Sequence, residues 1–277
     1  MNPEEKALKY DDLVSAVNHC DNMKKCSKKV EMTHCKNCKE VNLWTYWEGG
    51  RDRLDAEILV VGQDWGKLPD RKKTEATLQK AGDARGGFGY VNMFPEPVSQ
   101  TDLHLCQLMK EIDGCEDVES DYKQTGRKCK KVFFTNYVCC YREDNTSGKF
   151  DPVWTENCKE HFVNLVEIIQ PKIIICLGRK TYDSVLQAGG MAPSKGSYNA
   201  IILNSGERGG TMIKIGRTIV RVFPAAHPGT MGTLNRCRAK DNDSKEIKKE
   251  IGLALQKNDW KKINQYLGQE ENCGQRE

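Results

Sequence analysis

The sequence lacks any long hydrophobic run. No stretch approaches the roughly 18 apolar residues that a transmembrane helix needs. The first twenty residues, MNPEEKALKYDDLVSAVNHC, are charged and have helical periodicity, so they do not resemble a signal peptide. We therefore expect a cytoplasmic protein without a membrane partner.

Internal repeats, low-complexity tracts and Pro/Gly/Ser-rich linkers are also absent from the 277 residues. Their absence indicates that residues 1–277 form a single domain. Residues 1–40 are expected to form an N-terminal helix and a Cys-rich segment packed on that domain, and residues 243–277 a C-terminal helical segment. The 38% hydrophobic and 30% charged residues are typical of a soluble protein.

The turn after the first strand-like run lacks both G-x-G-x-x-G and a P-loop lysine signature, which argues against a nucleotide-using Rossmann-type protein. The formal net charge at pH 7 is small, at +4. Basic residues do cluster at 71–73, 127–131 and 236–240. Such clusters are usually solvated surface, and nucleic-acid binding requires them to converge on one face.

Four short apolar runs predict buried strands, at 56–62, 132–138, 172–178 and 219–224. They are nearly continuous and rich in β-branched residues, which is typical of a parallel sheet covered on both faces. Two helical patterns separate them: residues 101–112 place Leu103, Leu108 and Met109 on one face, and residues 153–169 end before Pro171. The alternation predicts an α/β fold, a three-layer α/β/α sandwich around a central four-stranded parallel sheet.

Three of these runs lead into polar side chains. The first runs into Gln63 and Asp64, the second carries Asn136 near its end, and the last ends at His227. Ligands of such sheets bind beyond the carboxyl ends of the strands. A turn aspartate, a capping asparagine and a surface histidine each have an ordinary structural explanation, but together they predict one crevice containing a carboxylate, an amide and an imidazole.

The order of these motifs resembles the uracil-DNA glycosylase superfamily, especially its iron–sulfur (family 4) branch. G-Q-D at 62–64 is similar to the G-Q-D-P of the superfamily's uracil enzymes, T-N-Y-V-C-C at 135–140 to T-N-V-V-K-C, and P-K-I-I-I-C-L-G at 171–178 to the branch's P-x-x-I-x-x-L-G strand. A histidine–proline pair completes the order at 227–228. The resemblance covers roughly residues 35–238.

The resemblance implies a monofunctional glycosylase that hydrolyses the N-glycosidic bond of a flipped-out uracil or related pyrimidine in DNA and leaves an abasic site. Asp64 and His227 would be catalytic, and Gln63 and Asn136 would bind the base. An aromatic side chain would stack on the base; Phe94 is favoured slightly over Phe88 and Trp65. A DNA-penetrating loop would follow His227, where the resemblance assigns Met231 or Leu234 as the wedge and Arg236 and Arg238 as phosphate contacts.

Thirteen cysteines without a secretion signal favour thiols or metal ligands over disulfides. Four thiolates can hold zinc or a [4Fe–4S] cluster, so the cysteines alone do not show which of the two is bound. The resemblance implies a [4Fe–4S] cluster with a structural role. Its ligands would be Cys35, Cys38, Cys140 and Cys158, with Cys20 and Cys26 as alternatives to the first pair.

The sequence also departs from the family around the pocket. Tyr141-Arg142-Glu143 replaces Arg-Pro-Pro, Trp65 stands where proline is common, and residues 67–100 form a longer, more basic connection. These departures leave two alternatives to a repair enzyme that excises uracil. One is a glycosylase that removes a modified or glycosylated pyrimidine from phage DNA in antiviral defence. The other is a non-catalytic nucleic-acid-binding iron–sulfur protein. A monomer is expected in each case.

Overall fold

The computed structural model describes residues 1–21, 32–33, 41, 49–64, 100–115, 129, 131–142, 151–237 and 243–273. Side chains are described for all of these except residues 32, 33, 141, 142 and 269–273. Within these ranges no helix is both long and apolar enough to span a membrane.

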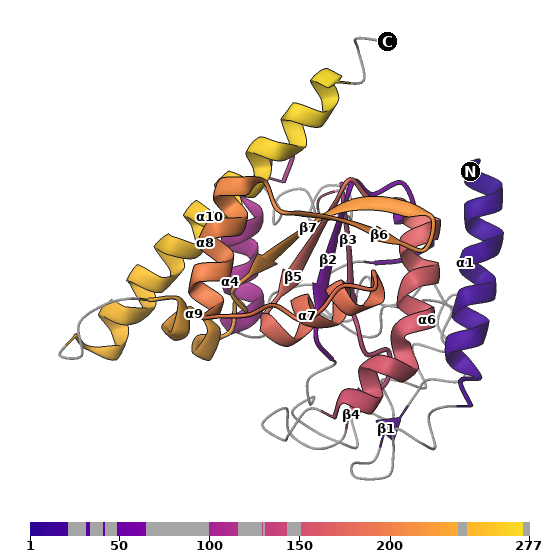
Figure 1. Cartoon of the computed structure of the whole chain (residues 1–277), viewed down its shortest axis with the longest axis horizontal. Helices are drawn as coiled ribbons and strands as arrows, with labels where there is room; N and C mark the ends of the chain where they lie inside the picture. The colour runs from indigo at the N-terminus through magenta and orange to yellow at the C-terminus, as the bar shows by residue number, and fades with distance from the viewer. Residues whose placement is uncertain are drawn as a thin grey trace.

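The centre of the molecule is a five-stranded sheet of order β3-β2-β5-β7-β6 (Figure 1). Four strands are parallel and correspond to the four predicted runs: β2 (Ile58–Gly62), β3 (Val132–Asn136), β5 (Ile173–Leu177) and β7 (Thr218–Ala225). The α/β prediction is therefore confirmed, and the strand count differs by one. The additional strand, β6 (Thr211–Ile215), pairs antiparallel with β7 at the edge.

The strand β6 was not predicted from the sequence, because only one of its faces is buried. Ile213 and Ile215 are buried in it, whereas Met212 and Lys214 are exposed. Such alternation is typical of an edge strand with one wet face, and it differs from the continuous apolar runs of the parallel strands.

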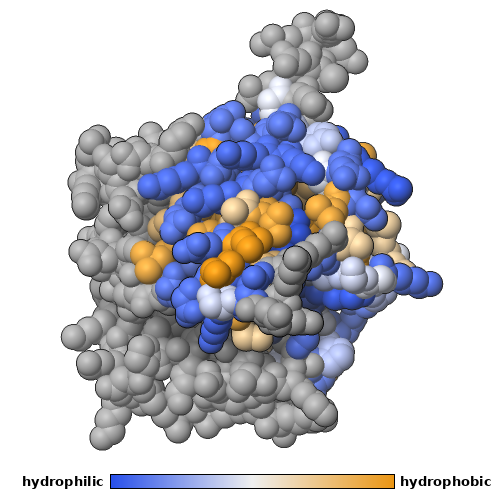
Figure 2. Space-filling model, turned by 90° about the vertical axis from the view of Figure 1, so that its left-hand side faces the viewer, coloured by the Kyte–Doolittle hydropathy of each residue, from blue (hydrophilic) through white to orange (hydrophobic). Residues whose placement is uncertain are grey.

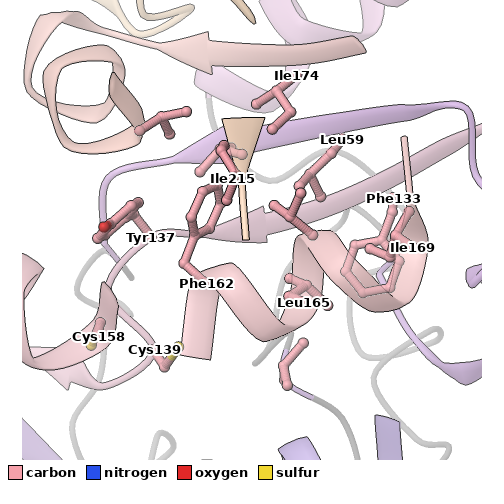
Figure 3. Close-up of a cluster of buried hydrophobic side chains, with 14 of the residues drawn as sticks. Leu59, Phe133, Tyr137, Cys139, Cys158, Phe162, Leu165, Ile169, Ile174 and Ile215 are labelled. Atoms are coloured by element: carbon pink, nitrogen blue, oxygen red, sulfur yellow. The ribbon is translucent and has the colours of Figure 1, made fainter. Parts of the chain in front are cut away.

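Helices cover both faces of the sheet (Figure 1). One layer contains α1 (Pro3–Asn18), α6 (Pro152–Ile169) and α7 (Arg179–Ala188); the other contains α4 (Gln100–Met109) and α10 (Lys245–Cys273). The helix α8 (Tyr198–Arg208) contacts both β7 and α10. The sheet separates two hydrophobic cores, because successive strand residues point to opposite faces. Leu59 and Val61 pack into the first core, and Ile58 and Val60 into the second. Figure 3 shows the first core around Leu165 and Phe162.

The boundaries of α6 follow from local chemistry. Asp151 caps the helix by accepting a hydrogen bond from the Val153 N–H at 3.1 Å, and Pro152 occupies the first turn. Gln170 ends the helix in a left-handed conformation directly before Pro171, as predicted. In α4 the prediction for Leu103 is wrong: it is 42% exposed, while Leu108 and Met109 are buried.

The remaining described elements are short. A 3₁₀ turn, η1 (Arg51–Arg53), precedes β2, and α9 (Thr230–Arg236) follows β7. β1 (Met32–Thr33) pairs antiparallel with β4 (Tyr141–Arg142). Cys115, just after α4, forms a disulfide with Cys129, just before β3. This bond departs from the expectation of thiols and metal ligands, because the fold brings the two Cα atoms within 4.9 Å.

Candidate active site

Sheet order brings the three polar segments to one edge. β2, β3, β5 and β7 are mutually parallel, so their carboxyl ends lie along the same side of the sheet. Gln63 and Asp64 follow β2, Asn136 ends the neighbouring β3, and His227 lies two residues beyond β7. Only β5 separates β2 from β7. The predicted crevice therefore has its carboxylate, amide and imidazole on adjacent or next-but-one strands.

Asn136 is held against a glycine. The register pairs Asn136 with Gly62, and the Asn136 side chain is buried. A Cβ atom on Gly62 would overlap Asn136 Oδ1. The glycine of the G-Q-D motif therefore makes room for the amide, which explains why these two motifs occur together.

We predict that Gly62→Ala lowers catalysis without unfolding the protein. The added methyl group pushes the Asn136 amide away, and a displacement of about 1 Å can cost about 10²-fold in rate. Single-turnover kinetics on a DNA substrate would measure the loss. Gly206→Ala is the matched control, since its Cβ would meet only the Lys262 side chain, at 3.2 Å or more. Equal rates for the two variants would contradict the assignment of Asn136.

Backbone hydrogen bonds fix Gly62 and Gln63, just before Asp64, to the residues that follow β3. The Tyr137 N–H donates to the Gly62 carbonyl at 2.9 Å, and the Val138 N–H donates to the Gln63 carbonyl at 3.0 Å. The Gln63 side-chain amide donates to Asp64 Oδ1 at 3.3 Å. Asp64 Oδ2 is buried as well. The carboxylate is therefore presented from a turn that is anchored to the end of β3, with Gln63 as its neighbour.

His227 has a defined tautomer. The backbone N–H of Gly229 donates to His227 Nδ1 at 2.9 Å, so Nδ1 is an acceptor and the neutral ring carries its proton on Nε2. The residue remains more than one-third exposed, at the wall of a hollow. Nε2–H is thus the donor that the imidazole offers to a ligand.

We predict that this imidazole stays neutral at pH 6.5. The surrounding protein atoms lower the pKa of His227 below its ordinary value of 6.5 by desolvation, so protonation requires a lower pH. NMR titration of the ring, assigned with a His227→Asn variant, should give a midpoint below 6.5 and an unprotonated Nδ1. A midpoint above 6.5 would contradict this account.

A second histidine supports the turn that carries His227. His104 of α4 is buried, and its Nδ1 lies 2.8 Å from the Pro228 carbonyl and 3.3 Å from Thr233 Oγ1. The Gln256 amide of α10 also donates to Thr233 Oγ1, at 3.3 Å. Sequence reasoning missed His104, since a single histidine on an apolar helix face carries no signal that separates it from ordinary core packing.

The segment after His227 differs from the predicted loop, because it forms the helix α9. Met231 is 67% exposed and Leu234 is half-buried, so their assignment as wedges stays a prediction. The assignment of Arg236 as a surface phosphate contact is wrong. Its side chain is 1% exposed, and its Nε and Nη2 atoms donate to the Asp259 carboxylate at 2.7 and 2.8 Å. Arg236 instead joins α9 to α10.

Several predicted residues lie outside the described ranges. They include Arg238, two proposed cluster ligands and the aromatic candidates for stacking on the base: Cys35, Cys38, Phe88, Phe94 and Trp65. Their assignments stay predictions.

Cys139, Cys140 and Cys158 belong to the first core. Cys139 and Cys158 are hydrogen-bonded to each other, which raises the pKa of the Cys139 thiol and lowers that of Cys158 (Figure 3). Cys140 is also buried. In the described part of the chain no three His, Cys, Asp or Glu side chains are arranged to hold a metal ion. Cys139 is therefore a direct neighbour of Cys158, and the assignment of Cys140 and Cys158 as cluster ligands stays a prediction.

Comparisons with known proteins agree with this arrangement. Residues 50–251 match the family model described as the uracil DNA glycosylase superfamily. The chain is also 26% identical over 221 residues to a protein of Sulfurisphaera tokodaii named type-4 uracil-DNA glycosylase. That alignment covers 79% of this chain and 81% of the relative.

Proposed function

The chain belongs to the uracil DNA glycosylase superfamily, and from this premise we propose that it releases uracil or a related pyrimidine from DNA by hydrolysing the N-glycosidic bond. The product would be an abasic site, as in base-excision repair. One observation carries the proposal: Asp64, Asn136 and His227 lie at or just beyond the ends of strands whose carboxyl ends share one edge of the sheet.

Asp64 acts at the sugar. Cleavage of the bond between base and sugar gives the sugar oxocarbenium character, so a nearby negative charge stabilises the transition state more than the ground state. The Asp64 carboxylate supplies that charge and can align a water for attack on the sugar carbon. The hydrogen bond from Gln63 leaves the charge in place while it orients the carboxylate.

Asn136 and His227 act at the base. The departing base becomes an anion, and a hydrogen bond to its carbonyl oxygen stabilises the developing charge. His227 donates that bond through Nε2–H, because Nδ1 already accepts the hydrogen bond from the Gly229 N–H. The Asn136 amide can both donate and accept, which matches O4 and N3–H of uracil.

Parallel assays define the base that is released. We expect the purified protein to release uracil from a uracil-containing oligonucleotide, detected as strand cleavage after alkali treatment. DNA with hydroxymethylated or glucosylated cytosine tests the defence alternative. Release from modified DNA alone would show that the substrate is a modified pyrimidine and not uracil. If no base is released from any substrate, the protein is a non-catalytic DNA-binding protein.

We also propose a [4Fe–4S] cluster held by Cys35, Cys38, Cys140 and Cys158. The donor set fits, because thiolates are the usual ligands of such clusters. Strand pairing supports it further: Thr33 lies opposite Tyr141, so the chain two residues before Cys35 meets the residue directly after Cys140. Bound there, the cluster would join the N-terminal segment to the end of β3.

Serine variants test the ligand assignment. Cys140→Ser and Cys158→Ser should lose iron and the visible absorbance of the cluster, and both should unfold more readily because metal binding is coupled to folding. Cys139→Ser is the matched control and should keep its iron. Loss of iron from Cys139→Ser but not from Cys140→Ser would move the ligand position by one residue.

A further inference from the structure

Two histidines lie on opposite sides of one peptide group. His104 Nδ1 lies 2.8 Å from the Pro228 carbonyl oxygen. The N–H of the same peptide belongs to Gly229 and donates to His227 Nδ1 at 2.9 Å. A carbonyl oxygen only accepts, so His104 Nδ1 carries a proton and is the donor, whereas His227 Nδ1 is an acceptor. One peptide group therefore joins two imidazoles whose Nδ1 atoms have opposite roles.

The His104 ring is enclosed by two other elements, α9 and α10. It is 6% exposed, on the helix α4, which packs against α10. Thr233 Oγ1 of α9 lies 3.3 Å from His104 Nδ1 and accepts a hydrogen bond from the Gln256 amide of α10, also at 3.3 Å. Figure 2 shows the molecule from the side that carries α9 and α10, and these buried contacts lie beneath that surface. The burial of the ring and its contact with Thr233 keep Nδ1 directed at the Pro228 carbonyl.

The orientation of this peptide decides which nitrogen of His227 is protonated. Turning the peptide over changes ψ of Pro228 and φ of Gly229, and glycine adopts either sign of φ. The Pro228 carbonyl would then face His227 Nδ1, which would have to carry the proton, and the neutral ring would have none on Nε2. The hydrogen bond from His104 to the Pro228 carbonyl is made only in the observed orientation, in which φ of Gly229 is −66°. His104 therefore favours the form in which His227 is a donor at Nε2.

We propose that His104 is a positioning residue, which holds the peptide at Gly229 in one orientation and thereby keeps the proton of His227 on Nε2. The inference rests on the proposed function, in which Nε2–H of His227 donates to the departing base. A hydrogen bond to a carbonyl also polarises its peptide, so the Gly229 N–H becomes a stronger donor. His104 thus acts on the base only through the peptide and the second imidazole.

The same contact opposes protonation of His227. A cationic ring has a proton on both nitrogens, so Nδ1–H would face the Gly229 N–H. Desolvation also lowers the pKa of His227. The described charged residues of the site and the hollow are Asp64 and two arginines that are each paired with an aspartate, Arg179 with Asp183 and Arg236 with Asp259. Loss of the contact with Gly229 should therefore raise the pKa of His227 and mix its tautomers.

Two substitutions of His104 separate its hydrogen bond from its packing. In His104→Leu the new side chain fills the space without a donor, whereas the amide of His104→Asn can donate from near the position of Nδ1. Thr233→Val is the matched control, because it removes a hydroxyl of the same network and leaves His104 beside Pro228. Long-range proton–nitrogen NMR on isotope-labelled histidines shows which ring nitrogens are protonated. This readout does not need base release, so it tests the inference separately from the glycosylase assignment.

The wild type should show His227 with its proton on Nε2 and His104 with a proton on Nδ1. His104→Leu should populate both tautomers of His227 and raise the midpoint of its titration by about one pH unit, the order expected for losing one hydrogen bond. His104→Asn and Thr233→Val should keep the wild-type tautomer. An unchanged His227 in His104→Leu would overturn the proposal, as would an equal change in Thr233→Val.

Base release gives a second readout. His104→Leu should lower the single-turnover rate by about 10-fold at unchanged DNA affinity, the factor that corresponds to one pH unit. A lower rate with an unchanged His227 spectrum would mean a purely structural role and would overturn the proposal. If no base is released from any substrate, the proposed function fails while the NMR test still decides the role of His104.

Thermal unfolding checks that each variant folds. If His104→Leu does not fold, His104→Phe takes its place, because it keeps a ring in the same space without a donor. The expected change in His227 is the same. In the wild type, an unprotonated Nδ1 on His104 would overturn the proposal without any variant.

Discussion

Replacing Asp64 by Asn is expected to lower the single-turnover rate of base release by about 10²-fold or more, the size typical of losing one transition-state contact. The amide has nearly the same shape as the carboxylate but no negative charge to stabilise the oxocarbenium-like sugar. His227→Ala should lower the rate to a similar extent, because it removes the Nε2–H donor at the departing base.

DNA affinity should barely change in either variant, because phosphate contacts supply most of it. Matched controls are Asp55→Asn, whose side chain is 81% exposed, and His19→Ala, an exposed residue near the end of α1. Both controls should retain the wild-type rate. Full activity of Asp64→Asn would exclude this mechanism for the chain.

Breaking the ion pair between Arg236 and Asp259 is the change expected to affect stability most. Arg236→Ala leaves a carboxylate that is 7% exposed without its partner, and an unpaired buried charge costs about 3–5 kcal/mol. Urea unfolding followed by circular dichroism would measure this loss. The exposed pair of Arg217 and Glu167 provides the comparison: Arg217 is 77% exposed, so Arg217→Ala should cost less than about 1 kcal/mol.

A double variant separates the pair from the fold around it. Replacing Arg236 by Met and Asp259 by Leu removes both charges and keeps apolar volume, which is often close to neutral for a buried pair. The double variant should therefore be more stable than Arg236→Ala. If Arg236→Ala unfolds like the wild type, the guanidinium does not hold α9 to α10.

The four buried strands were predictable because their composition is dictated by their environment. A parallel strand covered on both faces needs apolar residues at every position, and such runs stand out in a sequence. The positions of Asp64, Asn136 and His227 at one edge follow from the same rule, since parallel strands end on the same side. The strand β6 was not predicted, because about half of its residues face water.

Side-chain partners could not be predicted in this way. In the sequence, Arg236 lies in a basic cluster of the kind that contacts DNA. Only the fold shows that its Nε atom lies 2.7 Å from the carboxylate of Asp259, twenty-three residues later, and that it is a structural residue. The contact of His104 with Pro228 joins residues 124 positions apart. The hydrogen bond between Cys139 and Cys158 likewise joins residues of two different elements and leaves no pattern in the sequence.

By itself, the sequence determined the α/β class, the order of the parallel strands' motifs and the residue types at their ends, since burial and strand direction leave a local pattern. The tertiary structure alone decided that Gly62 makes room for Asn136, that Gly229 fixes the tautomer of His227, and that the arginine of α9 turns inward. These features depend on contacts between segments far apart in the chain or on the path of a turn, and neither leaves a periodic pattern in the residues that make them.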